Sequence, residues 1–523
     1  MLAMTNPHSI NVTKLVQGVP YFADPLIQYR TLCQQSAHNM LLESAEIESK
    51  DHLKSLILVQ AALKIRCDGH RLTFEGLTDN GQQLIPVLAN AFATYVEART
   101  NAQLIIELPR ADESLDEDAR LKSLSPLDGI RVLCDLLDLP QHQRDAIFVG
   151  GVLGYDLIDT VEPLPEVSAA NNPCPDYLFY LAEVMLKIDH QQQSSELYGL
   201  AFGDAPQHTG TVHQRLAQVA DSLEQLVATA PSPRPLTGVS EQAQASISDE
   251  AFNQCVVDLK QHIVAGDIFQ VVPSRSFSLP CPNPLGAYQA LRISNPSPYM
   301  FYLNSGEFSL FGASPESALK YDKQSNQVEI YPIAGTRIRG KDQNSAIDAD
   351  LDSRIELELR LDQKELAEHL MLVDLARNDV ARISAAGTRK VAELLKVDRY
   401  SHVMHLVSRV TGQLRDDLDA LHAYQASMNM GTLVGAPKIR AAQLIREVEQ
   451  ARRGSYGGAV GYFNGQGDMD TCIVIRSAMV HQGVAQVQAG AGVVYDSDPQ
   501  SESDETRNKA QAVISAIRQG GGL

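Results

Sequence analysis

The chain has 523 residues, of which 44% are hydrophobic and 21% are charged, and its formal net charge is −20. A chain of this length can bury a large core and is expected to form more than one domain. The acidic balance argues against nucleic acid or an anionic membrane as the main partner, because both bind through basic patches. It does not exclude a small anionic substrate, since a local pocket of Arg and Lys side chains overrides the overall field.

The N-terminal region and the cysteines predict a cytoplasmic protein. Residues 1–8 contain no basic segment followed by an apolar run, so no signal peptide is expected. The longest apolar stretches, such as residues 55–63, are far too short to span a bilayer. Seven cysteines are scattered without a C-x-x-C motif, which favours reduced thiols over a zinc site or a disulfide framework.

The first part of the chain mixes strand-like and helical segments. Residues 71–78 alternate like a strand, and Asp79-Asn80-Gly81 is typical of a turn. Residues 125–139 carry apolar side chains at helical spacing. Prolines and small polar residues between 228 and 250 then predict a linker. The predicted division is an N-terminal domain of residues 1–230, a linker of residues 231–248 and a second domain of residues 249–523.

Strands and helices follow in mixed order after the linker. Residues 249–266 and residues 502–518 are amphipathic helices by their apolar spacing. Residues 458–463 and 470–480 flank an Asn-Gly pair, which predicts a hairpin. Residues 485–495 alternate like a strand that glycines interrupt. This mixed order favours a layered α+β fold over regular βαβ units.

Two pairs of glutamates with the same spacing are the strongest chemical signal. Glu365 and Glu368 share one face of a predicted helix, and Glu502 and Glu505 repeat the spacing near the C-terminus. If the pairs meet, they predict a site for a hard cation such as Mg²⁺, which prefers oxygen ligands. The structural alternatives are a capping box that begins at Asp362 and a solvated first helical turn at the second pair.

Other polar segments carry weaker signals, each with a structural alternative. The glycines of Gly490-Ala491-Gly492 let backbone N–H groups approach an anion, although a bulged strand is equally consistent. Arg337 and Arg339 in a Gly-flanked turn, and Glu316 after a strand, also fit ordinary surface turns. His405 lies in an apolar strand, where a histidine is more often a satisfied core group than a catalyst. Motifs of P-loop, serine hydrolase, zinc peptidase and dinucleotide sites are absent from the sequence.

Taken together and in this order, these segments resemble the chorismate-utilising enzymes. The resemblance covers about residues 249–511, roughly half of the chain. The motifs that carry it are residues 266–275, 332–337, 367–379, 403–407 and 501–506. It implies an α+β fold of layered antiparallel sheets with flanking helices, in which an N-terminal regulatory half packs on a catalytic half.

Within that family the chain resembles the large, aminating subunits of anthranilate synthases. Gln270 stands where water-using relatives carry a lysine base, and ammonia is already a nucleophile without such a base. Ala334 stands where aminodeoxychorismate synthases carry a nucleophilic lysine, which favours direct attack at C2. The implied reaction is Mg²⁺-dependent amination of chorismate at C2, followed by loss of pyruvate to give anthranilate, at the first committed step of tryptophan biosynthesis.

The resemblance also implies the metal and substrate ligands. Glu368 and Glu505 would bind Mg²⁺ directly, with Glu365 and Glu502 in support, and the metal would hold the ring carboxylate of chorismate. The rest of the dianion is expected to bind to Gly335, Thr336, Tyr456, Arg476, Gly490, Ala491, Gly492 and Lys509.

Four catalytic residues follow from the same resemblance. Glu316 is the candidate general acid for the C4 hydroxyl, which is a poor leaving group until it is protonated. His405 is the candidate for assisting the loss of pyruvate, and Gln270 and Thr336 complete the set.

A feedback site for tryptophan and a partner subunit are implied as well. The predicted tryptophan site consists of Glu43, Ser44, Lys54, Pro298, Tyr299, Met300, Val460, Tyr462, Asp470 and Cys472. A ligand that bridges both halves can shift an equilibrium between them, although Glu43 and Ser44 also fit a simple strand-end turn. The sequence contains no G-x-C-x-G nucleophile with a partnering His-x-Glu. We therefore expect a separate glutamine amidotransferase subunit as the ammonia source, in a heterotetramer.

Three other functions compete with this interpretation. An aminodeoxychorismate synthase would aminate the para position, and a silent regulatory subunit would bind tryptophan without turnover. A scaffold protein with the same fold requires every motif to be coincidental.

Overall fold

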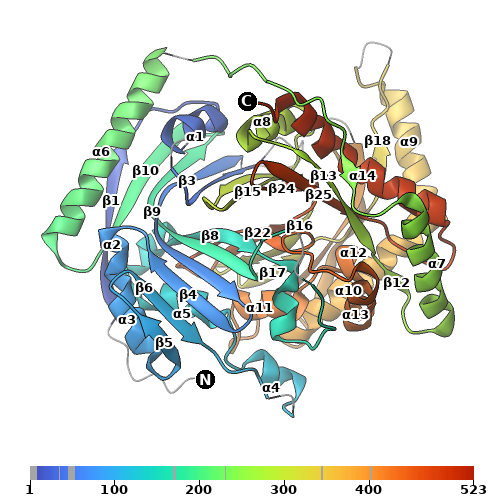
Figure 1. The fold of residues 1–523 in the computed structure, drawn as a ribbon, viewed down its shortest axis with the longest axis horizontal. Helices are drawn as coiled ribbons and strands as arrows, with labels where there is room; N and C mark the ends of the chain where they lie inside the picture. The colour runs from blue at the N-terminus through green and yellow to red at the C-terminus, as the bar shows by residue number, and fades with distance from the viewer. Residues whose placement is uncertain are drawn as a thin grey trace.

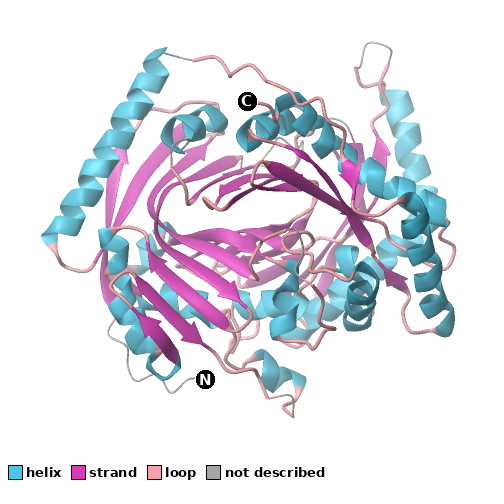
Figure 2. Cartoon of the chain, in the orientation of Figure 1, coloured by secondary structure: helices cyan, strands magenta, loops and turns pink. Residues whose placement is uncertain are grey.

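The computed structural model describes residues 9–33, 36–44, 53–112, 114–168, 172–229, 231–342, 346–400 and 403–523. Strands fill the centre of the molecule and helices surround them (Figures 1 and 2). The strands up to residue 230 are β1 Ile10–Gly18, β2 Asn39–Glu43, β3 Lys54–Asp68, β4 Arg71–Gly76, β5 Val96–Arg99, β6 Gln103–Glu107, β7 Leu137–Asp138, β8 Phe148–Leu153, β9 Tyr177–Asp189 and β10 Ser194–Phe202. The α-helices of this part are α1 Pro25–Cys33, α2 Asp79–Gln82, α3 Leu84–Ala91, α4 Glu117–Leu121, α5 Asp128–Leu136 and α6 Pro206–Thr229.

The second part of the chain continues the same alternation. Its strands are β11 Gln244–Ala245, β12 Gln270–Val271, β13 Ser274–Pro280, β14 Tyr299–Asn304, β15 Phe308–Ser314, β16 Ser317–Asp322, β17 Gln327–Ile330, β18 Ile333–Ile338, β19 Lys390–Arg399, β20 Val403–Gln413, β21 Gly435–Ala436, β22 Ala459–Asn464, β23 Met469–Ile473, β24 Ser477–His481 and β25 Val484–Gly490. Its α-helices are α7 Asp249–Ala265, α8 Pro284–Ser294, α9 Ala349–Leu361, α10 Gln363–Ile383, α11 Ala420–Ser427, α12 Gly431–Val434, α13 Lys438–Glu449 and α14 Pro499–Gly520.

Local capping explains where the predicted helices begin and end. The Ser248 side chain accepts a hydrogen bond from the Ala251 N–H at the start of α7, and Gly266 ends the helix with a φ of 83°. The Asp498 side chain accepts from the Ser501 N–H at the start of α14, where a proline occupies the first turn. Both predicted amphipathic helices are therefore confirmed.

Strands from both predicted domains form one sheet system. In the described part of the chain, 23 strands are linked by hydrogen bonds, and β12 and β21 form a separate pair. β2 pairs with β14, and β8 pairs with β22, in both cases antiparallel. The predicted α+β fold of antiparallel sheet layers with flanking helices is confirmed. Among the described residues no helix is long and apolar enough to cross a membrane.

The predicted linker corresponds to an extended segment between α6 and α7. It passes over the top of the molecule in Figure 1 toward the C-terminal helix. The Val239 N–H donates to the Arg518 carbonyl, and the Gly522 N–H donates to the Thr237 carbonyl. β11 within the segment pairs with β13. The linker is thus held against the second half of the chain.

Two large hydrophobic cores lie in the molecule, and each contains side chains from both halves. One core includes Phe179 from β9 and Val410 from β20. The other includes Val184 from β9 and Val487 from β25, with Ile517 of α14 beside them. Apolar surface of each half that is buried in these cores stabilises the packing of the two halves by about 25 cal/mol per Å². The cores therefore bind the two halves to one another.

Two local predictions differ from the structure. Residues 79–82 form the short helix α2 instead of a turn, because the Thr78 side chain accepts from the Gly81 N–H as an N-cap. The predicted strand of residues 470–480 is broken between β23 and β24, where Arg476 has a φ of 48°. This break places Arg476 at the candidate site instead of in a continuous strand.

Candidate active site

The first glutamate pair lies at the start of α10. The Asp362 side chain accepts from the N–H groups of Lys364 at 3.0 Å and Glu365 at 3.1 Å, so Asp362 caps the helix. The Glu365 carboxylate instead accepts from Arg337 Nη1 of β18 at 2.8 Å. Glu365 therefore links α10 to β18 and does not complete a reciprocal capping box.

Glu368 lies one turn further along α10 among other carboxylates. Its side chain is 24% exposed, and its Oε1 lies 3.9 Å from Lys364 Nζ. Burial raises the pKa of Glu368 to about 7, and the charges of Glu365, Glu505 and Glu502 add to that against the pull of Lys364. Charges from both glutamate pairs therefore act on Glu368, and the shared metal site stays a prediction.

The second pair lies in the first turns of α14. Glu502 is only 2% exposed, so the solvated-turn alternative fails for this residue. Burial raises the pKa of Glu502, and the charge of Glu505 adds to that, while a hydrogen bond from Ser497 opposes it. The Glu505 side chain is 41% exposed, so the solvated-turn alternative stands for it. Its Oε1 lies 2.5 Å from Lys509 Nζ, which outweighs partial desolvation and holds the pKa of Glu505 below its ordinary value.

These four carboxylates have the donor chemistry of a Mg²⁺ site, which takes oxygen ligands and retains waters. Burial, more than the neighbouring carboxylates, raises the pKa of Glu368, and a divalent cation would favour the charged form of such a group. Within the described ranges, no three His, Cys, Asp or Glu side chains are close enough together to enclose a metal by themselves. The four carboxylates therefore supply oxygen donors without forming a closed ligand cluster among the described residues.

Glu316 lies between β15 and β16 in a buried position. It is 7% exposed, and Thr432 Oγ1 of α12 donates to its Oε1 at 3.2 Å. Burial raises the pKa of Glu316 to about 8, against this hydrogen bond and the charges of Arg476 and Lys509. A carboxyl with this pKa is mostly protonated at neutral pH, although the charges of two cations act on it.

His405 lies on β20 opposite Thr336 of β18. Thr336 Oγ1 and His405 Nδ1 are 2.8 Å apart, and the Tyr400 ring contacts the imidazole edge to face at 5.3 Å between centroids. Burial and the charge of Arg476 lower the pKa of His405 to about 4. The imidazole is therefore neutral at neutral pH, which fits both a satisfied core histidine and a catalytic group that acts in its neutral form.

The predicted glycines lie where a side chain would collide with other site residues. A Cβ at Gly492 would lie 2.8 Å from Gln270 Nε2, and one at Gly490 would lie 3.1 Å from the Tyr456 hydroxyl. Gly335 has a φ of 82°, and a Cβ there would lie 3.2 Å from Glu365 Oε2. Gln270 is 5% exposed, and its Oε1 accepts no hydrogen bond from the described residues.

Cations and a tyrosine connect these segments. Lys509 Nζ donates to the Gly490 carbonyl at 3.0 Å. Burial lowers the pKa of Arg476, and the charges of Tyr456, Glu505 and Glu316 act against that. The predicted substrate and metal ligands therefore lie within electrostatic range of one another, although they come from distant parts of the chain.

Thr432 is the site residue that sequence reasoning missed. It lies in the short helix α12, directly after Gly431 and before the Gly435–Ala436 strand β21. A hydroxyl in a glycine-rich turn was the only local signal. Its contact with Glu316 joins residues 116 positions apart in sequence, which no local pattern indicates.

The predicted tryptophan site includes one buried carboxylate from the N-terminal half. The Tyr288 hydroxyl donates to Glu43 Oε1, and Arg292 Nη2 lies 3.1 Å from Glu43 Oε2. Burial raises the pKa of Glu43, while Arg292 and Tyr288 oppose that. The Ser44 N–H donates to the Lys54 carbonyl at 3.2 Å. Residues 45–52, which follow Ser44, lie outside the described residues.

The other predicted tryptophan ligands lie on neighbouring strands. Met300 of β14 faces Glu43 of β2 in the antiparallel register. The Tyr299 hydroxyl donates to Asp470 Oδ1 at 3.1 Å. Across β22 and β23, Asp470 faces Tyr462 and Cys472 faces Val460. Pro298 is buried directly before β14. The sheet thus connects ligands from both halves of the chain.

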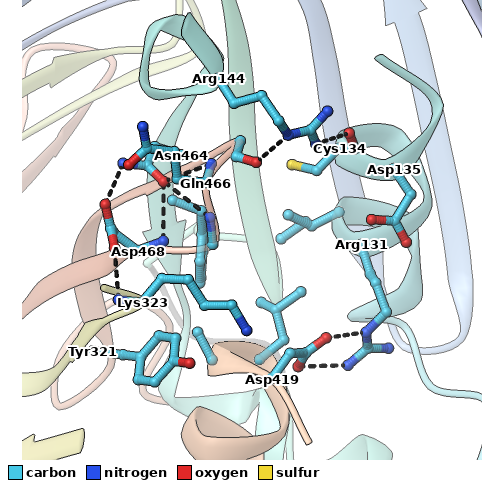
Figure 3. Close-up of a pocket in the computed structure, with 16 residues that line it drawn as sticks. Arg131, Cys134, Asp135, Arg144, Tyr321, Lys323, Asp419, Asn464, Gln466 and Asp468 are labelled. Atoms are coloured by element: carbon cyan, nitrogen blue, oxygen red, sulfur yellow. Dashed lines mark hydrogen bonds and ion pairs between the residues drawn. The ribbon is translucent and has the colours of Figure 1, made fainter. Parts of the chain in front are cut away.

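A separate pocket of about 190 Å³ lies between α5, α11 and the β22–β23 turn (Figure 3). Arg131 binds the Asp419 carboxylate there, and Arg144 donates to the main-chain oxygens of Gly465, Leu137 and Cys134. The residues that line this pocket include none of the predicted site residues. The pocket therefore belongs to a different surface of the molecule.

Comparisons with known proteins agree with this geometry. A family model described as chorismate binding enzyme matches residues 86–515. A relative from Vibrio cholerae named anthranilate synthase component 1 is 59% identical over 516 residues, which cover 97% of this chain and 98% of the relative. A relative of the same name from Escherichia coli is 56% identical over 499 residues, which cover 95% of each chain.

Solved structures give the same result. Anthranilate synthase component I from Streptococcus pneumoniae matches with a TM-score of 0.65 at 28% identity, over 94% of this chain and 97% of that chain. The menaquinone-specific isochorismate synthase from Escherichia coli matches with a TM-score of 0.61 at 17% identity, over 99% and 97%, which shows a shared fold. The family match begins at residue 86, so it extends beyond the resemblance that motifs alone indicated. This chain belongs to the family of chorismate binding enzymes.

Proposed function

We propose that this chain is the large subunit of an anthranilate synthase. It aminates chorismate at C2 with ammonia and then releases pyruvate to form anthranilate. The observation that carries the proposal is the buried Glu316, 7% exposed and bound by Thr432 Oγ1 at 3.2 Å, whose pKa burial raises to about 8 against the charges of Arg476 and Lys509. An acid that keeps its proton beside two cations suits a dianionic substrate with a poor leaving group.

The first step follows from the position of Glu316. The lone pair of ammonia forms the bond to C2, the ring double bonds shift, and the C4–O bond breaks. Glu316 gives its proton to the departing hydroxyl, which leaves as water, and the nitrogen releases one proton. The Thr432 hydroxyl holds the Glu316 carboxyl during this transfer, at 3.2 Å.

Gln270 and Ala334 support ammonia as the nucleophile, because ammonia attacks without the lysine base that activation of water requires. Gln270 is neutral, and its buried Oε1 is available to accept an N–H of ammonia. Ala334 offers no amine that would attack the ring in place of ammonia. Both residues therefore support direct amination at C2.

The second step removes the C2 proton, breaks the C3–O bond and aromatises the ring as pyruvate leaves. The neutral His405 imidazole, held by Thr336 at 2.8 Å, is the candidate that assists this elimination. Its low pKa keeps it in the basic form at neutral pH.

Substrate binding uses cations, backbone groups and a metal. Arg476, Lys509 and the Gly490–Gly492 backbone are suited to carboxylates of the dianion. Glu368 and Glu505 would hold Mg²⁺, with Glu365 and Glu502 in support, and the bound ion would supply positive charge for the ring carboxylate.

A partner and an inhibitor complete the proposal. A glutamine amidotransferase subunit would supply ammonia, since this sequence lacks its nucleophile motif. Tryptophan would bind between β2, β14 and the β22–β23 hairpin, where residues from both halves meet.

The test is a turnover assay on the purified chain with chorismate and Mg²⁺, with either ammonium or glutamine as nitrogen source. We expect anthranilate, identified by mass spectrometry, with ammonium alone. A para-aminated product would identify an aminodeoxychorismate synthase. Binding of tryptophan without any turnover would identify a regulatory subunit.

A further inference from the structure

Arg453 is a fully buried arginine beside the candidate site. The proposed reaction gives this arginine no role. Arg453 follows α13, is 1% exposed, and pairs with Glu449 of that helix. Its Nε donates to Glu449 Oε2 at 2.9 Å, and its Nη2 donates to Glu449 Oε1. Its Nη1 donates to the Leu433 carbonyl at 2.8 Å, and Nη2 donates to the Val272 carbonyl at 2.7 Å.

The guanidinium also lies over two tyrosine rings. Its Cζ is 4.7 Å from the centre of the Tyr155 ring and 5.5 Å from that of Tyr456. A planar cation over aromatic rings gains cation–π attraction in a desolvated place. Arg453 therefore contacts a predicted substrate ligand, Tyr456, through its ring.

Glu449 extends the contacts to another wall of the site. Its Oε1 accepts from the Ser274 N–H at 2.7 Å and from Ser274 Oγ at 2.8 Å. Ser274 lies opposite Gly490 in the β13–β25 register. Gly490 begins the predicted anion-binding backbone and accepts from Lys509.

The pair thus joins segments that carry the candidate site but are far apart in sequence. The Val272 carbonyl lies two residues after Gln270, and the Leu433 carbonyl directly follows Thr432, which holds Glu316. We propose that the Arg453–Glu449 pair is a positioning device that sets the distance between the Gln270–Thr432 wall and the Tyr456–Gly490 wall of the chorismate site. This inference rests on the proposed function.

Stability alone does not account for such a pair. Buried ion pairs lose much of their attraction to desolvation, and apolar replacements are often equally stable. Arg453 donates to two carbonyls and to Glu449, and Glu449 in turn holds Ser274. An apolar pair makes none of these directional hydrogen bonds. Lysine keeps the charge but has no planar fork.

The test compares Arg453→Lys with Arg446→Lys. Arg446 lies on α13, the helix that carries Glu449, is 3% exposed and pairs with Asp156 and Asp159 at 2.6 Å. Among the described residues it contacts none of the predicted site residues. We expect Arg453→Lys to raise the KM for chorismate by about 10-fold or more, a typical loss for misplaced binding groups. Arg446→Lys should leave KM within about twofold, with a similar fall in melting temperature. Equal KM values in the two variants would overturn the inference.

A second variant and a second readout guard against misfolding. Glu449→Gln combined with Arg453→Met removes both charges, so the fold should persist while chorismate binding in calorimetry weakens. Hydrogen exchange tests the positioning role independently of turnover. Amides near Ser274, Leu433 and Gly490 should exchange faster in Arg453→Lys than in the unmodified chain. Their exchange rates should stay unchanged in Arg446→Lys. Unchanged exchange at those amides refutes the positioning role, whereas absent chorismate turnover in the unmodified chain refutes the proposed function.

Discussion

At the scale of single residues, the candidate site works through side chains whose surroundings change their protonation. Burial raises the pKa of the Glu316 carboxyl to about 8 and lowers that of the His405 imidazole to about 4. One group therefore holds a proton at neutral pH and the other is free to take one. Pairs of groups with pKa values pushed in opposite directions are typical of acid and base assignments.

Glu316→Gln tests the acid. Turnover with ammonium should fall by about 10²- to 10⁴-fold, because the amide donates no proton to the leaving hydroxyl. In the unmodified chain, kcat per free ammonia should fall as pH rises through about 8, where Glu316 loses its proton. A variant with ordinary turnover would contradict the assignment.

The stability of Glu316→Gln provides the control. Because the folded-state pKa of about 8 exceeds the ordinary value of 4.5, the unmodified fold loses stability as pH rises between these values. The neutral glutamine does not titrate, so the melting temperature of the variant should not fall below that of the unmodified chain near pH 8. A lower melting temperature there would point to a structural role.

His405→Ala tests the second step. The 2-amino intermediate should accumulate, because the group that assists pyruvate loss is gone while Glu316 still acts. Chromatography with mass detection separates the intermediate from anthranilate. Thr336→Ser, which keeps the hydroxyl on His405, is the matched control with near-ordinary output. Unchanged anthranilate output in His405→Ala would remove the assignment.

At the scale of elements, the site is built where α10 and α14 bring four glutamates toward β18 and β25. Arg337 of β18 holds Glu365, and Lys509 of α14 holds both Glu505 and the Gly490 carbonyl. These contacts separate Glu365 from Glu368, since a carboxylate already bound to an arginine is less available to a metal, whereas the ranking of Glu505 above Glu502 rests on the family resemblance. They support Glu368 as a direct ligand and Glu365 as a supporting one.

Metal titration tests that ranking. Glu368→Gln and Glu505→Gln should weaken Mg²⁺ binding by more than about 100-fold, whereas Glu365→Gln and Glu502→Gln should weaken it by about 10- to 100-fold, as supporting groups do. Calorimetry with Mg²⁺, or electron paramagnetic resonance with Mn²⁺ in place of Mg²⁺, measures the metal affinity without turnover. Similar losses in all four variants would contradict the ranking.

At the scale of the whole molecule, the two predicted halves share one sheet system and two cores. β2 of the first half pairs with β14 of the second, and β8 pairs with β22. A ligand seated at the β2–β14 junction therefore contacts strands that continue toward the active site, which allows coupling between the two sites.

Ser44→Phe tests the feedback site. The ring should occupy the space for tryptophan beside Glu43, so inhibition of turnover by tryptophan should be lost while basal turnover persists. Ser44→Ala keeps a small side chain and should remain sensitive. Inhibition curves with ammonium as nitrogen source provide the measurement, and full sensitivity in Ser44→Phe would refute the site.

The sequence by itself determined the features that depend on local signals. Capped amphipathic helices such as α7 and α14, the α+β class and the family all followed from spacing, capping residues and motifs. The candidate site residues were also named from motifs, because such chemistry requires particular residue types at particular spacings.

Only the tertiary structure decided which of these residues meet and what else meets them. The Thr432–Glu316 bond, the Arg337–Glu365 pair and the burial of Arg453 depend on contacts between segments far apart in sequence. The break between β23 and β24 at Arg476 likewise depends on its surroundings, since the local sequence pattern is typical of a continuous strand. Packing and desolvation between distant segments set these contacts and the pKa values that follow, and neither is encoded in local periodicity.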